Sequence, residues 1–301
     1  MELTDTPQGS YQRWLFYGLW VALSLVIFWR PGIMLVRHAL ANDNASHILL
    51  IPFISAWLIL QQRRQIVARK SCDWGAAACL FAVAITVYGW TLHSAAQWSL
   101  GNSLASYAVA LVFFWIAGFA LVFGRAALQT NRFAMLFLFL SVPLPDTLLA
   151  RTVFLLQKGS AEIAGTLFDL TGVPVLREGF VFHLSRVNIE VARECSGIRS
   201  SMALLILAVL VGHFLLRPFW KQLVFVLCGV FVMIVKNGIR IVTLTLLGNY
   251  VDPGFLYGNL HREGGVVFFL LGLLLLVPVL WLLQRGEKTG RKTGEVPAAQ
   301  I

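Results

Sequence analysis

Residues 191–201 read VARECSGIRSS, and the interpretation of the whole chain starts from them. A polar segment meets an apolar run that begins at Ile198, so we expect Cys195 to lie at the first turn of a membrane helix. The free N–H groups and the helix dipole at such a position favour the thiolate form of a cysteine. With Arg193 and Arg199 nearby, Cys195 is a candidate nucleophile, although a cysteine at a helix end can also be a small packing residue.

The composition is that of an integral membrane protein. Of the 301 residues, 58% are hydrophobic and only 13% are charged, whereas about 25% are charged in an average soluble domain. The net charge of +10 could indicate a nucleic-acid partner, but much of the excess lies in short loops and the tail, as the positive-inside rule predicts. We therefore expect no nucleic-acid partner, and the basic residues indicate orientation instead.

The hydropathy pattern predicts an all-α polytopic membrane protein with about eight transmembrane helices. The basic cluster at residues 63–70 is the densest in any internal loop, which places that loop and both termini in the cytoplasm. We expect a single membrane domain over residues 1–301, in which residues 285–301 form a basic, disordered cytoplasmic tail. The predicted spans are residues 14–29, 48–60, 74–92, 104–123, 133–142, 198–216, 222–247 and 266–283.

Residues 143–195 are expected to lie outside the cytoplasm and to contain no span. Pro143-Leu144-Pro145 should end the preceding helix, because two prolines so close together break or kink it. The mixed pattern of residues 146–173 is typical of an amphipathic helix at the membrane surface. Apolar residues that alternate between Phe180 and Val191 predict a short periplasmic β-hairpin.

Cys195, Arg240 and His261 are predicted near the same outer face, although they are far apart in the sequence. An arginine inside a span costs ~2.5–3.5 kcal/mol and normally faces a polar cavity or a partner. Asn237, one helical turn from Arg240, favours such a pocket over snorkelling to the headgroups. An imidazole can exchange protons near neutral pH and a guanidinium can hold an oxyanion, so the three residue types suit cysteine acyl transfer.

Three motifs together resemble those of the exosortase/archaeosortase family: ECSGIRS at residues 194–200, NGIRI at 237–241, and His261 in the last external loop. Ser46-His47 and Pro143-Leu144-Pro145 also resemble family features. The resemblance implies a multispanning cysteine transpeptidase. Its substrates would carry a C-terminal sorting signal made of a short Pro-Glu-Pro-type (PEP-CTERM) motif, a membrane helix and a basic tail, and some members are linked to exopolysaccharide production.

By the same resemblance, Cys195 is the nucleophile, Arg240 the conserved arginine of the family and His261 its third site residue. Archaeosortases typically carry arginine at the third position, so His261 favours a bacterial exosortase. Such an enzyme is a multi-pass protein of the inner membrane whose active site faces the periplasm. Its partners would be the sorting signals of exported, membrane-anchored proteins and the surrounding lipid. Water, an amine, a lipid or a glycan all remain open as the acceptor.

Three further residues are candidates for substrate binding: Arg199, Glu194 and Asn237. Arg199 follows Cys195 by four residues, hence on the same helix face, and could bind an acidic residue of the substrate. Glu190 and Glu194 either pair with neighbouring arginines or orient the catalytic histidine.

We assign no cofactor and no metal. The other external histidines have no cysteine or carboxylate at the spacing of metal ligands. They are His47, His93 and His183.

A transporter, or a carrier that exports lipid-linked polysaccharide, is the alternative of a different class, because many polytopic proteins with intramembrane charge move solutes. The chain lacks the broken helices in corresponding halves that such carriers show, and its polar residues cluster toward one face. The pattern therefore favours an enzyme.

The charge pattern predicts the orientation of the loops. Reporter fusions at Arg69 and at the C-terminus should give a cytoplasmic signal, whereas fusions within residues 143–195 and 248–265 should give a periplasmic one. A periplasmic signal at Arg69 would contradict the predicted topology and would separate the candidate site residues from the compartment of their substrate.

Overall fold

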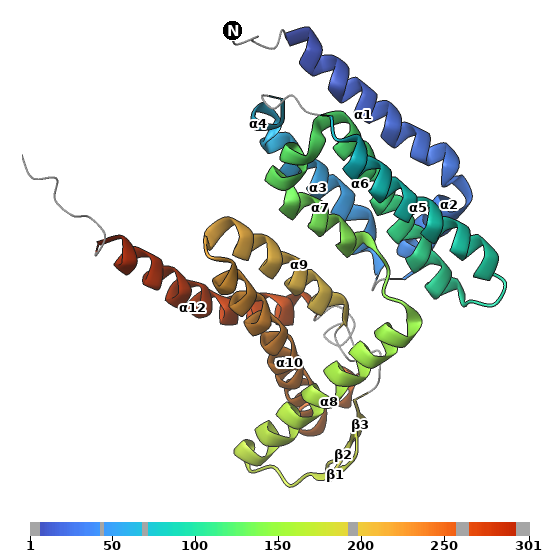
Figure 1. Ribbon diagram of the computed structural model, residues 1–301. Helices are drawn as coiled ribbons and strands as arrows, with labels where there is room; N and C mark the ends of the chain where they lie inside the picture. Colours follow the sequence, from blue (N-terminus) through green and yellow to red (C-terminus); the bar gives the residue numbers. More distant parts are fainter. Residues whose placement is uncertain (1–6, 43–44, 68–71, 192–197, 257–264, 293–301) are drawn as a thin grey trace, which may run out of the picture. The chain divides into compact units, whose positions relative to one another are not determined.

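The computed structural model describes residues 7–42, 45–67, 72–191, 198–256 and 265–292, which are mainly helical (Figure 1). They divide into two compact units, one up to residue 149 and one from residue 150.

The first unit is a helical bundle in which α1, α2, α4 and α5 all contact the long helix α6. Aromatic side chains join α1 to α6: Trp20 stacks on Phe114 and donates its indole hydrogen bond to the Phe114 carbonyl oxygen at 2.8 Å. The elements are α1 (Pro7–Ile27), α2 (Trp29–Ala41), α3 (His47–Gln61), α4 (Arg63–Val67), α5 (Trp74–Ser94), α6 (Leu100–Thr130), α7 (Arg132–Phe137) and the 3₁₀ turn η2 (Leu138–Ser141).

The chain after α1 differs from the sequence prediction. The first predicted span ended at residue 29, before Arg30 and Pro31, a pair typical of a helix end. Both residues instead lie in α2, which is bent by 85° from α1. Proline is favourable in a first helical turn because its missing N–H would have no helical partner there. The signal interpreted as a helix end therefore marks a new helix.

The second unit is organised around α10, against which α9 and α12 pack (Figure 1). The helix α12 continues beyond Gln284-Arg285, where the sequence analysis ended the last span and began a disordered tail. The elements are α8 (Asp146–Thr171), β1 (Leu176–Glu178), β2 (Val181–His183), β3 (Asn188–Glu190), α9 (Ile198–Leu215), α10 (Phe219–Tyr250), the 3₁₀ turn η4 (Pro253–Leu256) and α12 (Gly265–Lys292). The first four residues of α8, 146–149, belong to the first unit.

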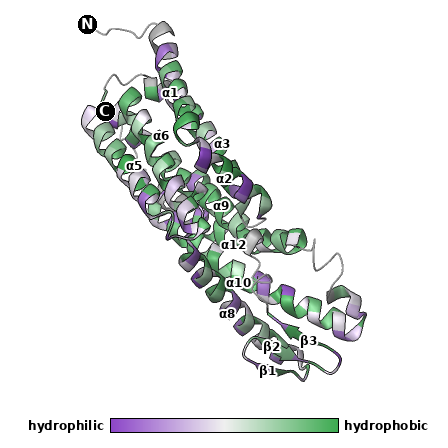
Figure 2. Ribbon diagram, turned by 90° about the vertical axis from the view of Figure 1, so that its right-hand side faces the viewer, coloured by the Kyte–Doolittle hydropathy of each residue, from purple (hydrophilic) through white to green (hydrophobic). Residues whose placement is uncertain are grey.

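Four helices in the described ranges are long and apolar enough to cross a membrane: α5, α6, α10 and residues 265–285 of α12. Two bent pairs, α1 with α2 and α7–η2 with α8, raise the number to six if each pair is one span, and α3 and α9 are shorter apolar helices. Hydrophobic residues predominate along α5 and α6, whereas α8 mixes both kinds (Figure 2). The chain is a polytopic all-α membrane protein, and eight full spans are not established.

Residues 176–190 form a three-stranded antiparallel sheet in the order β1-β2-β3. Sequence alternation predicted a single hairpin; the structure pairs β2 with β3 and adds β1 on the other side. Arg177 of β1 forms two hydrogen bonds with the Glu162 carboxylate of α8, at 3.0 and 2.8 Å. Hydrogen bonds to this carboxylate raise the pKa of the Arg177 guanidinium above its usual value. The two hydrogen bonds form a bidentate ion pair that joins the sheet to α8.

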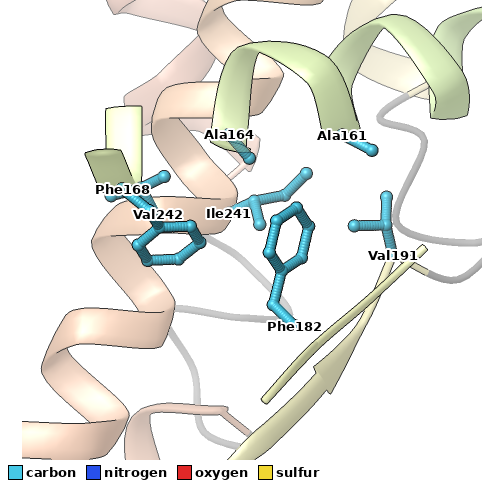
Figure 3. Packing of buried hydrophobic residues seen from close by; sticks show 7 residues of the cluster. All are labelled: Ala161, Ala164, Phe168, Phe182, Val191, Ile241 and Val242. Atoms are coloured by element: carbon cyan, nitrogen blue, oxygen red, sulfur yellow. The ribbon is translucent and has the colours of Figure 1, made fainter. Parts of the chain in front are cut away.

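The helices α8 and α10 approach closely where Gly238 faces Ile163. A Cβ at Gly238 would lie only 2.5 Å from Cγ2 of Ile163 and 2.8 Å from its Cβ, so no larger residue fits without a shift. Beside this crossing, side chains of α8, β2, α10 and the residue after β3 form one buried cluster (Figure 3). Its members are Ala161, Ala164, Phe168, Phe182, Val191, Ile241 and Val242.

We predict that Gly238→Ala lowers the free energy of unfolding by about 1–3 kcal/mol, because the added methyl group overpacks a rigid β-branched neighbour. Gly212→Ala on α9 is the matched control, since its Cβ would meet its nearest atom at 3.5 Å, an ordinary contact. The control should be neutral or stabilising, because alanine is the better helix former. Thermal unfolding in detergent measures both, and equal stability of the two variants would contradict the close crossing.

Candidate active site

Cys195, Glu194 and His261 lie outside the described residues. The chain on either side of residues 192–197 is described, and it is held at both ends.

On the N-terminal side, Val191 is almost completely buried in the cluster of Figure 3, where it lies near Ala161 of α8. Its backbone N–H donates to the Phe180 carbonyl oxygen at 2.9 Å. Its carbonyl oxygen accepts a hydrogen bond from the side-chain amide of Gln157, a buried residue of α8. Both backbone groups of Val191 are thus satisfied, and its position is fixed four residues before Cys195.

On the C-terminal side, Ser200 lies in the first turn of α9 and is contacted by α10. The Lys236 ammonium donates a hydrogen bond to the Ser200 hydroxyl. Lys236 is only 1% exposed, although it lies in the middle of an apolar helix.

The two anchors are connected through a third contact. The amide nitrogen of Asn237 donates to the Ser160 hydroxyl of α8 at 2.9 Å, and both residues are buried. Because Asn237 follows Lys236, and Ser160 lies one turn after Gln157, the contacts form one continuous set across α8, α9 and α10. We call Gln157, Ser160, Ser200, Lys236 and Asn237 the anchoring network.

Arg240 is half-buried and lies one turn after Lys236 on α10. The predicted span over residues 222–247 puts Arg240 seven residues from its outer end. Because α10 continues to Tyr250, Arg240 lies ten residues, about 15 Å, from that end. A charge at such a depth needs polar surroundings. Lys236 and Asn237 make this part of α10 polar on more than one side.

The remaining candidates are placed as follows. Arg199 lies in the first turn of α9. Glu190 ends β3 with an exposed side chain. Asn237, proposed as a substrate contact, uses its amide nitrogen to reach α8.

The turn between β2 and β3 is joined to the far end of α10. The Asn249 side-chain oxygen accepts hydrogen bonds from the Arg186 backbone N–H at 3.1 Å and from the Ser185 hydroxyl at 3.4 Å. Asn249 is 2% exposed, so these bonds stabilise a polar group that burial would otherwise penalise. The sheet that leads to the cysteine motif therefore rests on both α8 and α10.

Within the described ranges, no three histidine, cysteine, aspartate or glutamate side chains come together as metal ligands would. The polar residues that do come together there are amide, hydroxyl and ammonium groups. Such groups suit hydrogen bonding and charge stabilisation.

Sequence reasoning did not find Gln157, Ser160 or Ser200. Gln157 and Ser160 are three residues apart on an amphipathic helix, a spacing that puts them on one face, but nothing local distinguishes them from solvated residues. Lys236 was visible as a charge inside an apolar run, yet its partner on another helix was not.

A comparison with protein families matches the transmembrane exosortase model over residues 36–278. The chain belongs to the transmembrane exosortase family. The match includes both anchors of the cysteine motif and the polar part of α10. No curated protein and no solved structure matches the chain.

Membership of the exosortase family indicates a membrane sorting protease or transpeptidase that processes proteins bearing a sorting signal. The family is generally one of cysteine transpeptidases. The multi-pass, apolar helices of this exosortase agree with that setting.

The contact between Asn237 and Ser160 predicts energetic coupling of α8 with α10. In a double-mutant cycle of Asn237→Ala and Ser160→Ala, we expect a coupling energy of about 0.5–1.5 kcal/mol, the range for hydrogen bonds between membrane helices. Unfolding in detergent measures the four stabilities. Pairing Ser160→Ala with Thr86→Ala is the control, because Thr86 lies in the first unit and bonds only within α5. Strict additivity of Asn237→Ala and Ser160→Ala would contradict the contact.

Proposed function

We propose that this exosortase is a membrane-embedded cysteine protease or transpeptidase that cleaves C-terminal sorting signals of the Pro-Glu-Pro type at the periplasmic face of the inner membrane. Cys195 is the nucleophile, His261 transfers the proton and Arg240 stabilises the oxyanion. The observation that carries the proposal is the anchoring network, which holds both ends of the segment bearing the only cysteine of the family motif and adjoins Arg240.

The need for a rigid frame follows from the chemistry. A nucleophile must be held within a few tenths of an ångström of its attack geometry, and small misplacements cost large factors in rate. Gln157 fixes the chain before the cysteine and Lys236 fixes it after. The Asn237–Ser160 contact joins these two supports. Burying four polar side chains costs free energy, and their hydrogen bonds hold the segment between the supports in one geometry.

The proposed reaction has two steps. The Cys195 thiolate, formed as its proton passes to His261, attacks the scissile carbonyl carbon, and the Arg240 guanidinium stabilises the negative oxygen of the tetrahedral intermediate. The intermediate collapses to a thioester as the C–N bond breaks, and the imidazolium protonates the departing amine. An acceptor nucleophile then attacks the thioester and gives up its proton to His261, the C–S bond breaks to release the Cys195 thiolate, and this thiolate takes the proton back from His261.

We predict that Cys195→Ala abolishes cleavage with normal membrane levels, since the substitution removes one sulfur atom. Cys195→Ser should be nearly inactive, because a hydroxyl is a far poorer nucleophile than a thiolate. Cys228→Ala is the matched control: Cys228 is also on an apolar helix and is half-buried, but it lies far from the motif in sequence. Immunoblots of a co-expressed substrate, with mass spectrometry of its new C-terminus, measure processing.

Arg240→Lys should strongly reduce processing while expression is retained, because lysine keeps the charge but loses the planar fork. His261→Ala should reduce it by about 10²–10⁴-fold, the contribution of a general acid–base. Arg217→Lys and His93→Ala, outside the proposed site, control for non-specific loss and should process normally. Full processing by Cys195→Ala would overturn the cysteine mechanism and would favour the transporter alternative.

A further inference from the structure

The first unit contains a cavity that takes no part in the proposed mechanism. Its volume is about 580 Å³, within the range of about 300–1,000 Å³ that small-molecule sites occupy. The walls come from α1, α2, α3, α6 and η2, and all the lining residues belong to the described part of the chain before residue 149. The chemistry of these walls indicates which kind of molecule fits.

The orientation of α2 places it at the level of the lipid head groups. The helix α1 has 21 residues, a length of about 30 Å that matches the hydrocarbon core of a bilayer. Because α2 is bent by 85° from α1, it runs along the membrane plane when α1 crosses the membrane. A helix in this orientation lies at the boundary between acyl chains and head groups.

One face of α2 forms a wall of the cavity. Trp29, Gly32, Ile33 and Val36 have the spacing of a single helical face, and all four line the cavity. Arg37 follows them, lines the cavity as well and is exposed. The helix therefore contributes an apolar wall and a guanidinium group beside it.

This guanidinium group is the charged group of the cavity lining. Among the residues that the structure describes, no carboxylate forms an ion pair with Arg37. A phosphate is a suitable partner, because the planar guanidinium fork binds phosphate oxygens through two charge-assisted hydrogen bonds.

The polar side chains that line the rest of the cavity are already hydrogen-bonded within the protein. The Trp115 indole N–H donates to the Ser24 hydroxyl at 2.8 Å, and this hydroxyl donates to the Val21 carbonyl oxygen. The Ser141 hydroxyl donates to the Leu138 carbonyl oxygen at 2.7 Å. A polar ligand group would lose its water here without gaining a partner, so the interior suits hydrocarbon.

The cavity is also elongated. Its lining residues on α6 run from Ala108 to Trp115, seven residues or about 10 Å of helix. A hydrocarbon chain fills such a space, and a negatively charged head on that chain would meet Arg37. The bilayer that surrounds a polytopic protein supplies molecules of this kind at high local concentration.

We propose that this cavity is a binding site for one anionic phospholipid of the surrounding bilayer, with an acyl chain between α2, α3 and α6 and the phosphate on the Arg37 guanidinium. The site uses no residue of the cysteine mechanism or of the anchoring network. Its failure and the failure of the proposed function are therefore separate results.

The test measures the affinity for the first lipid bound to the purified, full-length protein by native mass spectrometry. The probes are dioleoyl phosphatidylglycerol and dioleoyl phosphatidylcholine, which share their acyl chains and differ in net charge. Phosphatidylglycerol should bind about fivefold more tightly, the effect of one basic residue on an anionic lipid. Arg37→Gln should bind phosphatidylglycerol about fivefold more weakly and lose this preference.

Arg30→Gln is the matched control for charge. Arg30 is also an exposed arginine of α2, but it does not line the cavity. The preference for phosphatidylglycerol should persist in this variant. An equal loss of preference in Arg30→Gln and Arg37→Gln would show a general attraction between α2 and anionic lipid, and would overturn the site.

Gly32→Leu tests the acyl-chain part of the site. A Cβ at Gly32 would meet no atom within 4 Å, and Gly32 lies in the middle of the face that lines the cavity. A leucine there should fill part of the cavity, so most of the affinity for both lipids should be lost. Thermal stability in detergent should stay equal or rise, because leucine is the better helix former.

Gly18→Leu is the control for this substitution. Gly18 lies on α1 in equally open surroundings but outside the cavity, so this variant should bind both lipids like the parent protein. If Gly32→Leu also bound both lipids normally, the acyl chain would lie elsewhere and the proposal would be wrong.

Two competitors distinguish the other possible occupants. Glycerol 3-phosphate carries the phosphate without acyl chains and should not displace phosphatidylglycerol; displacement at similar concentrations would show a site for phosphate alone. A synthetic membrane helix from a sorting-signal substrate should also leave the lipid bound. Displacement by this peptide, with peptide binding that depends on Gly32 but not on Arg37, would make the cavity a groove for substrate and overturn the lipid site.

Discussion

The second unit depends on one constraint: a polar group in an apolar interior must be hydrogen-bonded, because no water replaces a missing partner. Four polar side chains of α8 and α10 are buried at the same level of the unit: Gln157, Ser160, Lys236 and Asn237. Each is satisfied by a group on a different element. The partners they require join α8, α9 and α10 more specifically than apolar contacts could, since apolar contacts have no preferred direction.

Close helix packing is the condition under which these hydrogen bonds can form. Gly238 lets α10 approach Ile163 of α8, and Gly272 leaves room for the stem of Lys236 between α9 and α12. Small residues serve this purpose in membrane proteins because lipid supplies no hydrophobic drive for helices to associate. The glycine in the motif Asn237-Gly238 is therefore part of the same construction as the asparagine beside it.

The anchoring network also has a bearing on catalysis. Bonds that involve buried polar groups stabilise a single arrangement, since any other arrangement leaves a donor unpaired. Under the proposed function, a cysteine that attacks a peptide bond next to the membrane would need such a fixed frame, because its substrate would be held by a separate membrane helix.

The sequence by itself determined the class of this protein and several of its element ends. Hydropathy predicted a polytopic all-α membrane protein, although four to six candidate spans are found among the described residues where eight were expected. Pro143-Leu144-Pro145 marked the end of η2. Both signals depend only on neighbouring residues. The family motifs around Cys195 and Arg240 could be recognised for the same reason. The family that they indicated is the one whose model matches residues 36–278.

Only the tertiary structure decided which polar residues meet. Pro31 lies in the first turn of a helix instead of ending one, since a proline is compatible with both positions and the surrounding packing selects between them. The partners Gln157 and Val191, or Ser200 and Lys236, are separated by more than thirty residues. No local pattern encodes such a contact, because it arises when helices cross, and the crossing depends on Gly238 and Gly272 at points that only the folded chain brings together.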